Sequence, residues 1–235
     1  MKIYYIGVFR NDPKPAHELC AVNDLSSFSF FQRSTVAEFL TFFSTNVAER
    51  TAPAQRQDIQ EQSYTFHVYG RSEGCAGVII SDHEYPKLVA HKLLTQVMDD
   101  FLTLHPRAKW ANGTVKLDLP SLQDYIKKYQ DPRQADSILK IQQELDETKI
   151  VLHRTIESVL ERGTKIENLV ERSEGLSAQS KMFYTQVRKL ERASQNTENI
   201  AHANWSWLST GKEAELLLLH FIRRYYGDCC IRYLR

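Results

Sequence analysis

The feature that most constrains this chain is a long stripe of apolar and small residues in its second half, interrupted by one arginine. Counting outward from Arg162 in alternating steps of three and four gives seven positions before it and eight after it. Such an alternation is the 3.5-residue period that keeps one face of a helix against partner helices. Because one helix cannot bury this face alone, the pattern predicts a long coiled-coil helix that requires partners. The positions are Ile138, Ile141, Leu145, Thr148, Leu152, Thr155, Val159, Arg162, Ile166, Leu169, Ser173, Leu176, Ser180, Phe183, Val187 and Leu190.

Arg162 stands where the stripe would place an apolar side chain. A guanidinium has five N–H donors and no acceptor, so it is costly to leave unpaired in a dry interface. Two copies facing each other in a homodimer would repel, whereas neutral carbonyl groups, such as glutamine amides on other helices, would satisfy the donors and fix the register. The alternative is that Arg162 turns outward from a simple two-stranded coil and reaches solvent.

The residues around Arg162 resemble a known motif. The runs at 142–149 (QQELDETK) and 159–163 (VLERG) are similar to the R-SNARE motif of membrane-fusion proteins. The N-terminal run at 2–10 (KIYYIGVFR), together with 68–80 and 82–86, resembles the longin domain. More narrowly, the chain resembles the synaptobrevin-like longin R-SNAREs (v-SNAREs) that are lipid-anchored and lack a transmembrane helix.

This resemblance implies a fold and a function. It places Arg162 in the central layer of a four-helix bundle, opposite glutamines from three Q-SNARE helices on the opposing membrane, with the other stripe positions as the remaining layers. It implies membrane fusion in intracellular vesicle-mediated transport, on the cytoplasmic face of Golgi, endosomal or vacuolar membranes. The expected fold class is α+β: a longin (profilin-like) five-stranded antiparallel sheet flanked by helices, followed by a long single helix. We expect the longin domain over 1–130, the R-SNARE motif over 135–195, and an atypical, poorly ordered tail over 196–235.

Proline marks the domain boundary, because all seven prolines precede residue 133 and proline interrupts helices. In the first half, period-two patterns and turn residues predict strands at 3–9, 18–22, 64–69 and 75–81, with 55–60 as the remaining strand. Helices are expected at about 35–49, capped by Ser34, at 86–104, and briefly near 122–129. The expected core stripes of the first two helices are Val36, Phe39, Leu40, Phe43 and Val47, and Val89, Leu93, Val97, Phe101 and Leu104.

Phe42 does not belong to the stripe of the first helix. At 100° per residue it projects about 120° away from that stripe. One interpretation is a wide helix buried on two sides. The other is an exposed aromatic patch that binds an apolar segment. The resemblance implies that this surface of a longin domain can hold the protein's own SNARE helix, so we expect Phe42 to anchor an autoinhibitory closed state.

The SNARE segment is expected to fold only with partners. Thr148, Thr155, Ser173 and Ser180 weaken the stripe, and Gly163 and Gly175 each cost about 1 kcal/mol in a helix interior relative to alanine. Paired along its whole length, the segment would form a rod on the order of 80 Å long. A second hypothesis is a cytosolic trafficking adaptor or tether with a homomeric coiled coil.

Signals for other functions are weak. A formal net charge of +1 argues against nucleic acid as a partner. The string at 70–74 (GRSEG) matches the nucleophile elbow of hydrolases, which would make Ser72 a nucleophile, but that chemistry needs a strand, a sharp turn and then a helix, whereas here the string joins two expected strands. The eight histidines show no metal-ligand spacing, so we predict no catalytic residue, metal or cofactor. The four cysteines show no disulfide framework and fit a reducing cytosol.

The tail departs from the lipid-anchored pattern. Cys229 and Cys230 are adjacent, but five residues follow them, so the last four residues are no prenylation box. Palmitoylation of Cys229 or Cys230 is the remaining lipidation hypothesis, and the basic-aromatic run at 221–226 suits a membrane surface. The apolar run at 216–222 is far shorter than the ~20 residues that span a bilayer. An alternative terminus beyond about residue 195 is the other interpretation.

Overall fold

The computed structural model describes residues 2–61, 63–130, 149–160 and 164–186. The chain divides into two compact units, Met1–Lys181 and Met182–Arg235. The first unit contains all the strands and named helices discussed below, and the second is described only over 182–186, which are helical. Among the described residues, no helix combines the length and the apolar character that crossing a membrane requires.

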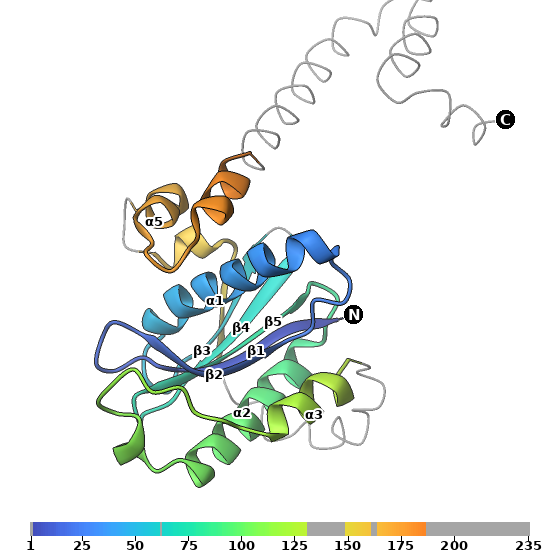
Figure 1. The fold of residues 1–235 in the computed structure, drawn as a ribbon. Coiled ribbons are helices and arrows are strands. Elements are labelled where there is room, and N and C mark those ends of the chain that lie inside the picture. The colour runs from blue at the N-terminus through green and yellow to red at the C-terminus, as the bar shows by residue number, and fades with distance from the viewer. Residues whose placement is uncertain (1, 62, 131–148, 161–163, 187–235) are drawn as a thin grey trace, which may run out of the picture. The chain divides into compact units, whose positions relative to one another are not determined.

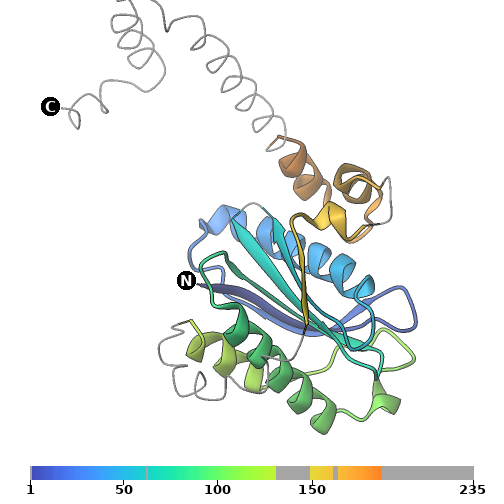
Figure 2. The same ribbon diagram turned by 180° about the vertical axis from the view of Figure 1, so that it is seen from behind.

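A mixed β-sheet forms the centre of the first unit (Figures 1 and 2). Its strands lie in the spatial order β2-β1-β5-β4-β3-β6. The first five pair antiparallel with their neighbours, and β6 pairs parallel with β3. The strands are β1 (Ile3–Arg10), β2 (His17–Asn23), β3 (Arg56–Glu61), β4 (Tyr64–Gly70), β5 (Cys75–Asp82) and β6 (Ile150–His153).

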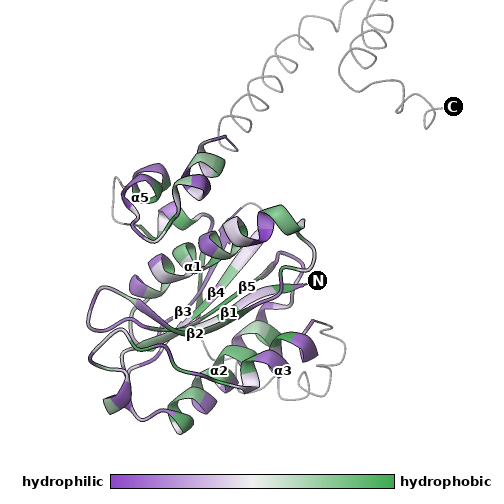
Figure 3. Cartoon of the chain, in the orientation of Figure 1, coloured by the Kyte–Doolittle hydropathy of each residue, from purple (hydrophilic) through white to green (hydrophobic). Residues whose placement is uncertain are grey.

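Helices cover both faces of the sheet, with α1 on one face and α2 and α3 on the other (Figures 1 and 2). The helices are α1 (Arg33–Glu49), α2 (Lys87–Leu104), α3 (Ser121–Lys128) and α5 (Ile166–Arg172). Within the described residues, short 3-10 turns accompany them at η1 (Phe30–Gln32), η2 (Arg107–Lys109) and η4 (Ile156–Ser158). Figure 3 shows green, hydrophobic residues along the strands and purple, hydrophilic residues on the loops and around α5.

The pleat of β4 distributes side chains between the two faces, because successive side chains of a strand point to opposite sides. Phe66 packs edge-on against Phe43 of α1, with ring centroids 6.5 Å apart. The next residue, His67, reaches the opposite face and approaches His91 of α2. On that face α2 lies so close to β5 that a Cβ on Gly77 would come within 3.0 Å of Met98 and Leu94. This side of the sheet holds the larger core, which also includes the fully buried Trp110.

The structure confirms the α+β longin architecture and the order of the predicted elements, including the strand at 55–60, which is β3. Three details were wrong. Ser34 does not cap α1, which begins at Arg33 after Gln32. In α1 only Val47 of the predicted core stripe is buried, and the face nearest the sheet carries the small residues Thr35, Ser44 and Ala48. Leu104, at the end of α2, is 50% exposed.

The largest correction concerns the predicted long helix. Over its described residues the segment from 149 to 181 instead contains β6, η4, α5 and a further helical turn from residue 178. The sheet therefore has six strands rather than five. The physical reason is that the stripe needs partner helices to be buried in a bundle, and the isolated chain has none. The segment therefore packs as short elements in the first unit.

Candidate functional site: the surface that holds residues 149–181

The first part of this site is the edge of β3 that faces away from β4 and is occupied by β6. Without β6, β3 would expose a row of unpaired N–H and C=O groups, which is an open template for another strand. Residues 150–153 fill that edge in parallel, with Asp58 opposite Leu152 and Ile59 opposite His153. In Figure 2 the yellow strand β6 lies at this edge of the sheet. Main-chain pairing of this kind depends little on side-chain identity, so a segment with a helical sequence pattern can still provide the strand.

The chain beyond β6 is anchored by the end of β3. The backbone N–H of Ile156 donates to Glu61 Oε2 over 2.9 Å, and η4 follows directly. Thr155 caps that turn, since its hydroxyl accepts from the N–H of Ser158. The side chains of Ile156 and Leu160 are buried. These contacts turn the chain away from the sheet edge.

The second part of the site is α1. The backbone N–H of Ser177 donates to Glu38 Oε2 over 2.9 Å. This hydrogen bond lowers the pKa of the Glu38 carboxyl below its usual value, because it stabilises the charged form. Between residues 164 and 181, the side chains of four residues are buried: Ile166, Val170, Leu176 and Ser180.

Between α1 and this segment lies a groove of about 530 Å³. Phe42 lines it from α1, and Ser173 and Gly175 line it from the other side. Phe42 is half-buried and packs edge-on against Phe43, with centroids 5.2 Å apart. The rest of the lining is mixed: Pro15, Ala16, Ala37, Glu38, Thr41, Thr45, Asn46 and Glu49.

Two family models match successive parts of the chain. Residues 25–126 match the longin family, described as a Regulated-SNARE-like domain, and residues 137–202 match the synaptobrevin family. The fission yeast (Schizosaccharomyces pombe) protein "Synaptobrevin homolog ykt6" is 58% identical over 189 residues, which is 80% of this chain and 96% of that protein. This chain belongs to the longin-domain R-SNAREs. The Saccharomyces cerevisiae protein "Synaptobrevin homolog YKT6" is 56% identical over 192 residues, again 80% of this chain and 96% of that protein.

As an R-SNARE of the synaptobrevin type, the chain acts in vesicle traffic at membranes, and its homologues are SNARE proteins, which are not enzymes. The homomeric tether is not favoured by these matches. The GRSEG string is a hairpin turn, because Ser72 lies exposed between β4 and β5 and donates to Glu73 Oε2 over 3.0 Å. It has none of the strand-turn-helix context of a nucleophile elbow.

Among the described residues, the predicted layer positions of the SNARE motif fall into three groups. Ile166, Leu176 and Ser180 are buried, and Val159, Leu169 and Ser173 are half-buried. Leu152 and Thr155 are exposed, as is Phe183 in the second unit. Outside the described residues lie Arg162 and the remaining candidates: Ile138, Ile141, Leu145, Thr148, Val187, Leu190, Cys229 and Cys230.

Sequence reasoning missed part of the surface that the SNARE segment buries. Ile156, Leu160 and Val170 each follow a stripe position by one residue and are buried, while the stripe positions Thr155, Val159 and Leu169 are not. Glu38 and Ser177 were missed as well. The apolar side chains of Ile156, Leu160 and Val170 could have indicated that they are buried. The 3.5-residue period of a bundle helix instead places them beside the buried stripe.

Proposed function

We propose that this R-SNARE alternates between two states that use the same residues. In the open state the stripe around Arg162 joins three glutamine-bearing Q-SNARE helices in a four-helix bundle that draws two membranes together. In the closed state, residues 149–181 are held on the longin domain by β3 and α1, as described above, and Phe42 contributes to the surface that holds them.

One observation carries this proposal: residues 150–153 are a β-strand in the sheet, with Leu152 exposed, although Leu152 is a layer position of the bundle. A residue cannot belong to a β-ladder and to an α-helix at the same time. The burial of Ile166, Leu176 and Ser180 withholds three more layer positions. Assembly with Q-SNAREs therefore requires that the segment first leave the longin domain.

The contacts are of a strength that permits such release. β6 is only four residues long and stands at a sheet edge. The Glu38–Ser177 hydrogen bond is exposed, and an intramolecular hydrogen bond contributes only about 0.5–1.5 kcal/mol net. Complete pairing of the stripe in a bundle would bury every layer position, which is more apolar surface than the closed state buries.

We place the chain on the cytoplasmic face of trafficking membranes, with Golgi, endosomal or vacuolar membranes as the candidates. Its membrane contact would be peripheral, with Cys229 or Cys230 as the acylation candidates and the basic-aromatic run at 221–226 as a surface contact. We assign no catalytic step to it.

The test is assembly from purified components. The full chain should form a thermally resistant complex only when three glutamine-bearing SNARE helices are supplied together. Arg162→Ala should lower the melting temperature of that complex, because the three glutamines lose their shared donor. Arg172→Ala, at an exposed position off the stripe, is the matched control and should leave it unchanged. A complex that contains only copies of this chain would refute the proposal.

A further inference from the structure

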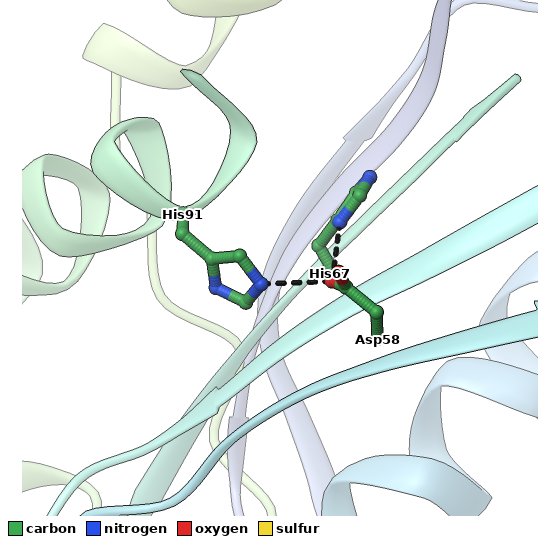
Figure 4. Close-up of side chains that lie close together, drawn as sticks. All are labelled: Asp58, His67 and His91. Atoms are coloured by element: carbon green, nitrogen blue, oxygen red, sulfur yellow. Dashed lines mark hydrogen bonds and ion pairs between the residues drawn. The ribbon is translucent and has the colours of Figure 1, made fainter. Parts of the chain in front are cut away.

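A cluster of three ionisable side chains lies inside the longin domain, away from the surface that holds the SNARE segment. Asp58 comes from β3, His67 from the adjacent position of β4, and His91 from α2 (Figure 4). All three are buried, and one ligand atom from each lies within 4.8 Å of the others. Asp58 Oδ1 is 2.7 Å from His67 Nδ1 and 2.8 Å from His91 Nε2.

One oxygen of the Asp58 carboxylate accepts no hydrogen bond. Oδ2 is buried and has no hydrogen-bond partner, and Lys87 Nζ stands 3.9 Å from it. Both histidine contacts go to the other oxygen, Oδ1. A buried carboxylate oxygen without a donor is a deficit that an ion can remove.

His67 links the carboxylate to a second polar group. Its Nδ1 lies 2.7 Å from Asp58 Oδ1, and its Nε2 lies 3.0 Å from Ser81 Oγ. Ser81 Oγ also donates to the Asp82 carbonyl over 3.0 Å. Both nitrogens of His67 therefore have a polar neighbour, and Nδ1 is the nitrogen that faces the carboxylate.

We propose that Asp58, His67 and His91 form a buried site for a divalent transition-metal ion, with Zn²⁺ as the best match. Two imidazole nitrogens and one carboxylate oxygen are a ligand set that zinc accepts, with a water molecule as the fourth ligand. The site does not depend on the proposed closed state of the SNARE segment. The wide separation of the ligands in the sequence is the reason that no spacing motif predicts it.

The geometry also sets how strongly each residue contributes. Tetrahedral zinc with bonds of about 2.0–2.1 Å separates its ligand atoms by roughly 3.3 Å, so the side chains must spread by about 0.5 Å. The hydrogen bond of His67 to Ser81 is the outer-shell contact that orients a metal-bound imidazole. His91 Nδ1 lacks a partner, which makes His91 the weaker of the two histidine ligands. The cationic Arg56 and Lys87 lie nearby and lower the affinity for a dication.

The position of the site gives it a structural consequence. An ion there would join β3, β4 and α2, and β3 is the strand that pairs with β6. Lys87 is half-exposed and marks the side from which the cluster is nearest to solvent. An ion bound there would stiffen the longin domain at the sheet edge.

Metal binding by the untagged full chain tests the proposal. After removal of metal by a chelator, the chain should bind one equivalent of Zn²⁺ or Co²⁺, and Co²⁺ should give the visible d–d absorption of a four-coordinate nitrogen and oxygen site. The same measurement on a Cys229→Ser/Cys230→Ser variant removes thiolate binding in the tail, and its spectrum should not change. An equivalent bound only when Cys229 and Cys230 are present would overturn the proposal.

Variants then locate the ion. Asp58→Asn and His67→Gln should weaken Co²⁺ binding by about 100-fold or more, and Ser81→Ala, which keeps every ligand, by about 10- to 100-fold through His67. His17→Gln, a histidine outside the cluster, is the matched control and should bind normally. If Asp58→Asn or His67→Gln fails to fold, the proposal is tested by comparing the Co²⁺ affinity of Ser81→Ala with that of the wild type, together with the wild-type spectrum. A wild-type chain that binds no metal would show that the cluster holds only protons and would refute the site.

Discussion

The backbone N–H of Ser177 donates a 2.9 Å hydrogen bond to the carboxylate of Glu38, which joins the SNARE motif to helix α1 of the longin domain. Because this bond is stronger to the ionised carboxylate, it lowers the pKa of Glu38 below its usual value. The bond therefore stabilises the contact above that range and weakens as pH falls through the lowered pKa. The amide chemical shift of Ser177 should therefore titrate with an apparent pKa below the ordinary glutamate value of about 4.3. In Glu38→Gln this titration should vanish, and an unshifted titration would show that the bond does not form in solution.

Phe42 should hold the closed state through the groove that it shares with Ser173 and Gly175. Phe42→Glu places a charge in that groove and should release the SNARE segment, with a larger hydrodynamic radius and faster limited proteolysis between residues 149 and 181. Phe31→Glu adds the same charge to a phenylalanine that is 86% exposed and should change neither measurement. If the Phe42→Glu chain is as compact as the wild type, Phe42 does not hold the SNARE segment in the closed state.

The pairing of β6 with β3 should depend on the backbone of residues 150–153. Val151→Pro removes an N–H and restricts the strand, so it should detach β6 at a cost on the order of 1 kcal/mol per lost hydrogen bond. Hydrogen exchange of the amides of β3 should then accelerate. Lys149→Pro, just outside the strand, is the control. Equal protection of β3 in Val151→Pro and in the wild type would mean that β6 does not protect this edge.

Cys20 and Cys75 should be inert thiols in the folded chain. Both are free and buried, and burial raises the pKa of each to about 12. At pH 8 the thiolate fraction is then roughly one in ten thousand, so a maleimide should modify neither residue until the longin domain unfolds. Mass spectrometry of labelled peptides measures this directly. Lipid found on Cys20 or Cys75 of native protein would contradict the burial described here.

Much of the longin fold could be predicted, because period-two and period-3.6 patterns survive wherever an element has one buried face. The core face of α1 could not be predicted, since small residues such as Ser44 and Ala48 bring the helix close to the sheet while the larger Phe39 and Leu40 stay half-buried. The helical spacing of the large apolar residues therefore predicted a core stripe of which only Val47 is buried.

The candidate site was only partly predictable for a different reason. Residues 149–181 carry the sequence pattern of a bundle helix, and that pattern describes a partner complex rather than the isolated chain. Ile150–His153 become a strand because β3 offers an unpaired edge, which is a property of another part of the chain. The Asp58, His67 and His91 cluster was missed because only the sheet register and the approach of α2 bring these residues together.

The central claim is that the SNARE motif cannot assemble until it leaves the longin domain. The most direct measurement uses a chain with Cys229→Ser and Cys230→Ser, in which Glu38→Cys and Ser177→Cys are joined by a short cleavable bis-maleimide, while Cys20 and Cys75 stay buried. We predict that the cross-linked chain does not form the thermally resistant complex with three glutamine-bearing helices, and that cleavage of the linker restores it. Assembly of the cross-linked chain at the rate of the cleaved chain would contradict the account.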